Sequence, residues 1–147
     1  MPMKMKYLGS SGTKVSELCL GTMTFGQTGS MPGQCGESAS HELLTAFADA
    51  GGNFIDSANV YQGGVSEQYV GSWLAGKARD DFVVATKLRF GAGAEGGANN
   101  QGLGRKHVKA AVARSLANLQ TDCIDLLQIH AWDVGTPIKE IIRLLAV

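Results

Sequence analysis

The segment Phe82-Val83-Val84-Ala85-Thr86-Lys87 is an apolar and β-branched run that ends in an ionisable group. Two other segments end in the same way, Asn53-Phe54-Ile55-Asp56 and Ile124-Asp125-Leu126-Leu127-Gln128-Ile129-His130. A strand that serves only packing has no reason to stop at an ionisable side chain three times. These segments therefore predict strands of an α/β sheet whose carboxyl-terminal edge carries a site, because α/β folds keep their chemistry there.

Helical patterns alternate with these strands. Four helices are expected, at about 40–50, 66–76, 108–119 and 136–145, from apolar residues that recur at steps of three and four. Gly51-Gly52 ends the first helix, and Ser66 is the expected N-cap of the second. In the fourth, Thr136 is the expected N-cap and Pro137 the first helical residue.

The beginning of the chain predicts a hairpin. Gly9-Ser10-Ser11-Gly12 is a turn signal between the β-prone pairs Tyr7-Leu8 and Lys14-Val15. Leu18-Cys19-Leu20 then reads as the first strand of the main sheet. The fold class is therefore α/β, a single domain over 1–147 with a hairpin at 5–18 and four βα units over 18–147. Strands that alternate with helices in this way pair in parallel.

Four polar side chains at the predicted strand ends form a set suited to proton transfer. Tyr61 offers a phenol that can donate a proton, and Lys87 an ammonium that favours the phenolate. Asp56 offers a carboxylate to hold the ammonium, and His130 an imidazole to orient a carbonyl oxygen. Taken singly, three of them have a plain structural explanation: a packed tyrosine with a wet hydroxyl, a solvated lysine and a hydrogen-bonded histidine. Their joint occurrence favours chemistry.

At these residues the chain resembles the aldo-keto reductase family. Its signature is matched by Gly51-Gly52-Asn53-Phe54-Ile55-Asp56-Ser57-Ala58-Asn59-Val60-Tyr61, followed by Gly63-Gly64-Val65-Ser66-Glu67. Further matching blocks follow the family's order, and they are Gly21-Thr22-Met23-Thr24-Phe25-Gly26, Ala85-Thr86-Lys87, Gly102-Leu103-Gly104-Arg105-Lys106-His107 and Leu116 to His130. The resemblance spans nearly the whole chain.

The resemblance implies a TIM-type (β/α)₈ barrel, of which this sequence holds the first half. Such a barrel needs roughly 250 residues, whereas this chain has 147. Half a barrel would present two open strand edges, which invite pairing with another chain. Three explanations stay open: a fragment of a longer gene product, a half-barrel that forms a homodimer, or a sequence whose C-terminal half is missing. The pattern of the last helix, interrupted at Val147, favours a truncated product.

The resemblance also implies an NADP-dependent oxidoreductase that reduces small aldehydes or ketones to alcohols. Tyr61 would protonate the developing alkoxide, Lys87 would assist, Asp56 would fix Lys87 and lie near the nicotinamide ribose, and His130 would orient the substrate. The residues implied at the nicotinamide end of NADP(H) are Gly21, Thr22, Met23 and Asp56. Those implied for the walls of the substrate pocket are Phe25, Phe90 and Trp132. Absence of the C-terminal half would impair the activity.

Two alternatives from other functional classes stay open. The family includes the β-subunits of potassium channels, which Gly102 to His107 also resembles, so a non-catalytic regulatory or binding module is one reading. An inactive fragment that keeps the ancestral residues is another. His130 is present where the channel subunits depart from the reductase pattern, which favours the enzyme.

The amino-acid composition restricts the classes of binding partner and the cellular compartment that we expect. Thirteen basic residues balance thirteen acidic ones, which gives no electrostatic footprint for nucleic acid or acidic lipid. Three cysteines, Cys19 and Cys123 in expected strands and Cys35 in a loop, show neither a disulfide framework nor metal-ligand spacing. The sequence has no apolar run of about 18 residues, and residues 1–7 have no apolar core of signal-peptide length. We therefore expect a cytoplasmic protein with no metal, no membrane and no nucleic-acid partner.

The segment Gly91-Ala92-Gly93-Ala94-Glu95-Gly96 matches the G-x-G-x-x-G pattern of dinucleotide-binding loops. That fingerprint requires a helix to begin at once, so that its N-terminus faces the pyrophosphate. Here Gly97 to Gly102 follows instead, and no helix is expected before Arg105. The segment is therefore interpreted as a mobile surface loop over the active-site face.

Overall fold

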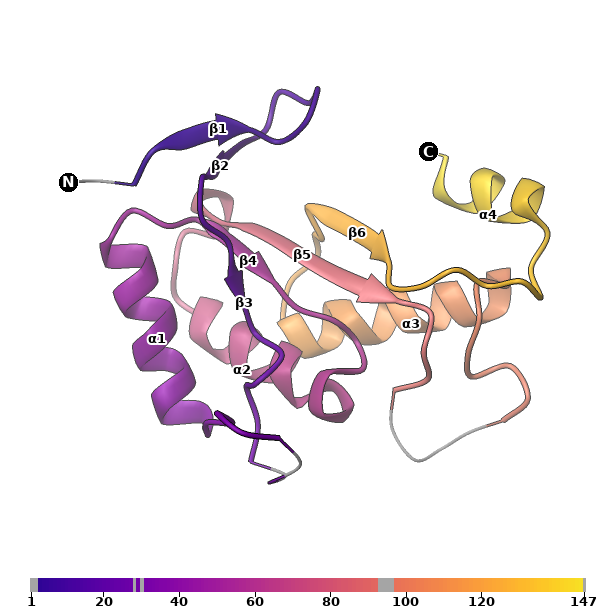
Figure 1. The fold of residues 1–147 in the computed structure, drawn as a ribbon, viewed down its shortest axis with the longest axis horizontal. Coiled ribbons are helices and arrows are strands. Elements are labelled where there is room, and N and C mark those ends of the chain that lie inside the picture. Colours follow the sequence, from indigo (N-terminus) through magenta and orange to yellow (C-terminus); the bar gives the residue numbers. More distant parts are fainter. Residues whose placement is uncertain (1–2, 28, 30, 93–96, 147) are drawn as a thin grey trace.

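The computed structural model describes residues 3–27, 29, 31–92 and 97–146. Two antiparallel strands, β1 (Met5–Tyr7) and β2 (Lys14–Ser16), form a hairpin at the start of the chain. The main sheet has four parallel strands in the order β3 (Leu20–Gly21), β4 (Phe54–Asp56), β5 (Val83–Leu88) and β6 (Leu126–Ile129) (Figure 1). The predicted hairpin and parallel sheet are both confirmed.

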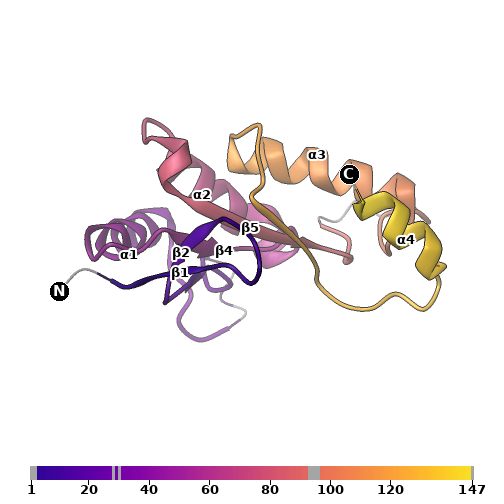
Figure 2. The same cartoon turned by 90° about the horizontal axis from the view of Figure 1, so that it is seen from above.

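An α-helix follows each strand of the main sheet. These helices are α1 (Glu37–Asp49), α2 (Val65–Leu74), α3 (Arg105–Leu119) and α4 (Ile138–Leu145). Two short 3₁₀ helices, η1 (Tyr61–Gly64) and η2 (Arg79–Asp81), lie before α2 and before β5. Figure 2 shows α2 and α3 together on one side of the strands. The chain is therefore built as a hairpin followed by (βα)₄, as the sequence predicts.

Alternating side chains of β5 show which face of the sheet the helices cover. Val84 packs in a core cluster with Leu44 of α1 and Val70 of α2. Leu88 belongs to a second cluster, which includes residues of α3 and α4. Because successive side chains of a strand point to opposite faces, Lys87 projects from the other face. The face that the helices leave open, from which Lys87 projects, can therefore carry a site.

A glycine sets the distance between α2 and α3. A Cβ atom added at Gly71 would meet the backbone of Asn118 and Leu119. Only a residue without a side chain allows the two helices to approach so closely. This approach brings the side chain of Asn118 to the buried carboxylate of Glu67, with 3.0 Å between Asn118 Nδ2 and Glu67 Oε2.

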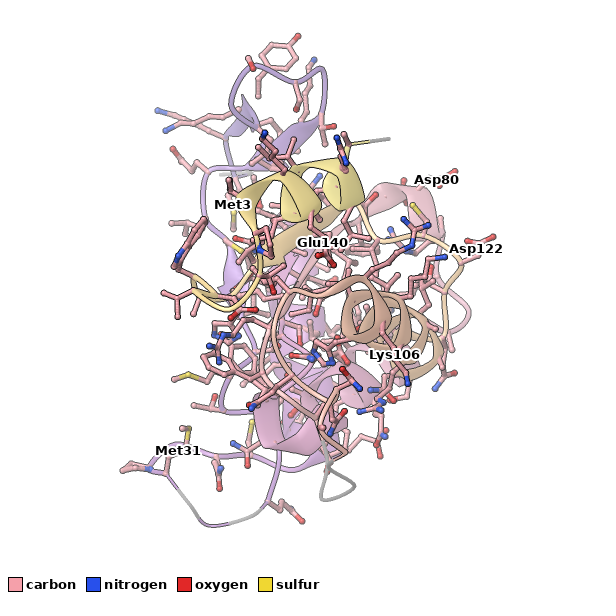
Figure 3. The ribbon with its side chains drawn as sticks, turned by 90° about the vertical axis from the view of Figure 1, so that its right-hand side faces the viewer. Met3, Met31, Asp80, Lys106, Asp122 and Glu140 are labelled. Atoms are coloured by element: carbon pink, nitrogen blue, oxygen red, sulfur yellow. The ribbon has the colours of Figure 1, made fainter. Side chains whose placement is uncertain are left out.

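The N-terminal end of α3 is capped from α4. The backbone N–H of Arg105 donates to Glu140 Oε1 over 3.1 Å. In Figure 3, where α3 is seen nearly end-on, Glu140 of α4 lies beside it and Lys106 projects from α3. A carboxylate at this position satisfies a free N–H group and complements the positive end of the helix dipole.

Several predicted boundaries need correction. The first strand of the sheet is Leu20–Gly21 and not 18–20, so Cys19 precedes it. Cys123 also lies outside a strand, because β6 begins only at Leu126. The first helix begins at Glu37, three residues before the expected start at Ser40. Strand ends are set by backbone pairing with the neighbouring strand, which the propensities of single residues do not reveal.

Both predicted N-caps are wrong. The N-cap of α2 is Gly64, whose φ of 102° suits glycine, and the Ser66 hydroxyl donates to the Thr22 carbonyl instead, over 2.7 Å. The N-cap of α4 is Pro137, while the Thr136 hydroxyl donates to Asp133 over 2.6 Å. The Ser66 hydroxyl is taken by a partner far away in the sequence, and the Thr136 hydroxyl by one three residues earlier in the chain.

Part of the predicted glycine-rich loop, residues 93–96, lies outside the described residues. Helix α3 begins at Arg105, three residues before the expected start at Val108, and no helix precedes it among the described residues after β5. No helix in the part of the chain that the structure describes is long and apolar enough to cross a membrane.

Candidate active site

Three neighbouring parallel strands bring the predicted proton-transfer residues together. Asp56 is the last residue of β4, Lys87 lies one residue before the end of β5, and His130 directly follows β6. Tyr61 begins the 3₁₀ helix η1, five residues after β4 ends. Parallel pairing places all these strand ends at one edge, so residues far apart in the sequence share one site.

The Lys87 ammonium is the centre of the site. Its Nζ lies 2.6 Å from Asp56 Oδ2, 2.7 Å from the Ser57 carbonyl oxygen and 3.2 Å from Tyr61 Oη. The side chains of Lys87 and Asp56 are 14% and 26% exposed, so the ion pair is partly shielded from water. Three acceptors match the three N–H bonds of an ammonium, which fixes the lysine beside the phenol.

Asp56 is held from a second side by a residue that the sequence reasoning missed. Gln128 of β6 donates from Nε2 to Asp56 Oδ1 over 3.0 Å. Gln128 also pairs with Lys87 in the strand register. The signal was present in the sequence, because Gln128 is a polar residue within an apolar run and shares the side-chain parity of His130.

The turn that carries Tyr61 has an unusual backbone. Gln62 and Gly63 both have positive φ, at 51° and 67°, immediately after Tyr61. Gly26 packs directly on this turn, because a Cβ atom added at Gly26 would lie 2.8 Å from the Cβ atom of Gln62. The tight turn places the phenol over the sheet edge, where its oxygen reaches the lysine.

His130 lies beside the phenol ring. Its ring makes edge-to-face contacts with Tyr61 and Phe90, at centroid distances of 5.7 Å and 5.2 Å. Burial lowers the pKa of His130, and the Lys87 charge lowers it further, against the opposing effect of Asp56. Nδ1 is buried without a hydrogen-bond partner in the described structure. A neutral imidazole with an unused nitrogen can bind a substrate oxygen or position one.

The residues predicted for the nicotinamide end lie on the loop that leaves β3. Gly21 pairs with Asp56 in the sheet register, and Met23 is 48% exposed. Thr22 is fully buried, and its hydroxyl lies 2.7 Å from Ser66 Oγ and 3.2 Å from the Asp56 carbonyl. Thr22 thus fixes the loop to β4 and α2, while Gly21 and Met23 present surface beside Asp56.

Of the three predicted wall residues, the structure brings one into contact with the site. Phe90 contacts His130, as described above. Trp132 is 58% exposed in the segment after β6. Phe25 is 1% exposed and packs in the core cluster with Leu44 and Ile55.

Among the described residues no group of three or more His, Cys, Asp or Glu side chains could hold a metal ion. The three cysteines are free thiols. Cys19 lies near the ion pair, and burial together with the Asp56 charge raises its pKa to about 11, against the opposing effect of Lys87.

Comparison with known proteins agrees with this geometry. The family model described as "Aldo/keto reductase family" matches residues 17–146. The norsolorinic acid reductase of Aspergillus flavus is 46% identical over 141 residues, which cover 91% of this chain and 36% of that protein. An aryl-alcohol dehydrogenase of Pestalotiopsis microspora is 42% identical and is matched over 37% of its length. This chain therefore spans little more than a third of these two relatives.

A solved structure of an aldo-keto reductase is also similar to this chain in its fold. The holo form of an aldo-keto reductase from Bacillus halodurans superposes with a TM-score of 0.80 at 37% identity. The match covers 97% of this chain and 45% of the other, so the hairpin and (βα)₄ correspond to part of a larger barrel. With the family model matched over most of its length and the strand-end residues in one cluster, this chain belongs to the aldo/keto reductase family.

Proposed function

We propose that this chain carries the proton-transfer site of an NADPH-dependent reductase that converts aldehydes or ketones to alcohols. The observation that carries the proposal is the position of Lys87 Nζ, 3.2 Å from Tyr61 Oη and 2.6 Å from Asp56 Oδ2. An ammonium fixed by a carboxylate and directed at a phenol is the arrangement that assists proton release from tyrosine.

In the proposed reaction, the carbonyl oxygen of the substrate lies between Tyr61 Oη and the His130 ring. Tyr61 donates its proton to this oxygen as negative charge develops there, and the C–O double bond becomes a single bond. The Lys87 ammonium stabilises the phenolate that results. His130, kept neutral by its lowered pKa, orients the oxygen. A proton from water then restores the phenol.

The residues present fit one end of a nicotinamide cofactor. A Cβ atom added at Gly21 would meet nothing within 4 Å, so there is open space beside Asp56 at the strand end. Gly21, Met23 and Asp56 would hold the nicotinamide ribose end. When bound, the cofactor supplies the hydride that reduces the carbonyl carbon. The preference for NADP over NAD is part of the proposal, as is a cytoplasmic location.

The names of two relatives suggest the class of substrate. A norsolorinic acid reductase and an aryl-alcohol dehydrogenase are both similar to this chain. We therefore propose small aromatic aldehydes or ketones as the first substrates to test. Phe90 contacts His130 and is an aromatic side chain that suits such a ring.

The test is the Tyr61→Phe variant, which removes only the phenol oxygen. We expect NADPH-dependent reduction of benzaldehyde, followed by NADPH absorbance, to fall by at least about a hundredfold, the range for loss of a general acid. Tyr7→Phe is the matched control, because Tyr7 also has a lysine, Lys14, over its ring, yet it is 62% exposed in the hairpin. An unchanged rate in Tyr61→Phe would overturn the assignment of the acid. Repeating the assay with NADH tests the cofactor preference.

A further inference from the structure

Arg89 is a cationic side chain at the rim of the site, and the reaction proposed above does not use it. It directly follows β5 and lies two residues beyond Lys87. Its φ of 155° is positive, which is uncommon for a residue other than glycine. Backbone conformations of this kind cluster at functional sites.

The Arg89 guanidinium has no direct anionic partner in the described structure. Its Nε is buried and makes no hydrogen bond there, and none of the ion pairs between described residues includes Arg89. Asp133 is close enough to be affected by its charge, but the Asp133 carboxylate accepts instead from Leu103 N–H, Gly135 N–H and the Thr136 hydroxyl. A partly desolvated cation without an anionic partner favours an anionic ligand.

Aromatic contacts connect Arg89 to the reacting end of the site. The guanidinium carbon of Arg89 lies 4.9 Å from the centre of the Phe90 ring. Phe90 contacts His130, and His130 contacts Tyr61. The cation and the proton donor are therefore separated by the Phe90 and His130 rings, and a ligand that reaches both must place flat, apolar atoms along Phe90.

We propose that Arg89 determines substrate specificity by binding an anionic oxygen, a carboxylate in the simplest case, on the far side of an aromatic carbonyl substrate. The inference rests on the proposed reductase function and adds to it the class of substrate. The carbonyl group lies at Tyr61 and His130, the aromatic ring lies along Phe90, and the carboxylate pairs with the guanidinium. Arginine suits this role because its planar fork of N–H donors matches a carboxylate.

Binding is tested first, with ligands that need no turnover. 4-(Hydroxymethyl)benzoate, the alcohol that reduction of 4-formylbenzoate would give, and its uncharged methyl ester are titrated into the chain by calorimetry, with and without NADP⁺. We expect the carboxylate to bind about ten- to a hundredfold more tightly than the ester, as a charge-assisted hydrogen bond implies. Arg89→Gln should remove this difference, and Arg89→Lys should keep part of it.

Arg143→Gln is the matched control for the change in charge. Arg143 is an exposed residue of α4, and the substitution alters net charge by the same amount without touching Phe90 or His130. The carboxylate preference should persist in this variant. Equal affinity of the wild type for acid and ester, no binding of either, or the same loss for both in Arg89→Gln would overturn the inference.

Turnover then separates this inference from the proposed function. Wild-type reduction of 4-formylbenzoate and its methyl ester should both depend on Tyr61, and Arg89→Gln should lower kcat/KM for the acid alone. Equal turnover of both substrates in wild type and Arg89→Gln would leave the reductase function standing and remove Arg89 from it. Arg89-dependent binding of the acid, with neither aldehyde reduced by the wild type, would retain the anion site and overturn the reductase function.

Discussion

Gln128 Nε2 lies 3.0 Å from Asp56 Oδ1, the carboxylate oxygen that Lys87 leaves free. The carboxylate is therefore held from two neighbouring strands, by an ammonium on β5 and an amide on β6. Hydrogen bonds on both oxygens fix the plane of the carboxylate and, through it, the direction of the lysine. Gln128 affects the proposed acid through Asp56 and Lys87, and we therefore regard it as a positioning residue.

Gln128→Leu should lower kcat for carbonyl reduction about three- to tenfold with a small change in KM. The variant removes one hydrogen bond to a charged group, worth roughly 1 kcal/mol or somewhat more, without removing Asp56, Lys87 or Tyr61. Steady-state kinetics with benzaldehyde measure the effect. Gln101→Leu, an exposed position in the loop before α3, is the matched control. An unchanged kcat in a folded Gln128→Leu variant would show that Lys87 alone positions the carboxylate.

The sequence predicted that Asp56, Tyr61, Lys87 and His130 lie together because each ends or follows an apolar strand, a pattern that local residues determine. It did not reveal Gln128 or Arg89, whose importance depends on pairing between strands and on a change in backbone direction after β5. The prediction that Ser66 is the N-cap of α2 was wrong for a related reason. The Ser66 hydroxyl meets Thr22, which is 44 positions away in the sequence, and local patterns carry no information about such partners.

Glu67→Leu should destabilise the chain by roughly 2–4 kcal/mol. Glu67 is fully buried, and its two carboxylate oxygens accept from the Thr86 hydroxyl over 2.7 Å and from Asn118 Nδ2 over 3.0 Å. The substitution leaves two donors without this acceptor, the fully buried Thr86 hydroxyl and the partly buried Asn118 amide. Urea unfolding followed by circular dichroism measures the change. Glu42→Leu on the exposed face of α1 should have an effect within about 0.5 kcal/mol. A similarly small change for Glu67→Leu would mean that water replaces the carboxylate.

Acidification below about pH 6.5 should destabilise the chain through His130 and His107. Burial lowers the pKa of both histidines from the ordinary 6.5, with Lys87 adding to the effect at His130 and Arg114 at His107. Between the lowered folded value and 6.5 the unfolded chain binds more protons, so stability falls as the pH falls through that window. Urea midpoints at pH 7.5 and 5.5 measure the loss, which His107→Asn should reduce. Equal midpoints at the two pH values would contradict the prediction.

Cys19 should be alkylated by iodoacetamide about tenfold more slowly than N-acetylcysteine at pH 8. Raising its pKa from 9.0 to about 11 cuts the thiolate fraction about a hundredfold, and the greater nucleophilicity of a more basic thiolate recovers part of the rate. Peptide mass spectrometry of timed samples gives the rate at Cys19. Asp56→Asn should accelerate it, because the carboxylate disfavours the thiolate. Labelling as fast as the free amino acid would rule out the proposed effect of the site on this thiol.

We further propose that this chain, studied by itself, forms a homodimer or larger species through its open sheet. β3 and β6 are the edge strands of the described sheet, and Leu18 beside β3 is 61% exposed. Exposed strand edges pair readily with other chains. Sedimentation velocity over a concentration series should show self-association, and Leu18→Lys should weaken it because a charged side chain opposes edge pairing. A monomer at every concentration would refute the proposal.

The proposed acid and the groups that tune it all come from one continuous stretch of chain, from Asp56 to His130, and neighbouring parallel strands hold them in place. A gene segment that encodes this stretch transmits the whole proton-donating apparatus as one heritable unit. Recombination at its borders would exchange the surroundings without separating the tyrosine from its lysine. Residues outside this stretch, such as Gly21 and Met23 at the proposed nicotinamide end, can then change while the proposed acid keeps its lysine.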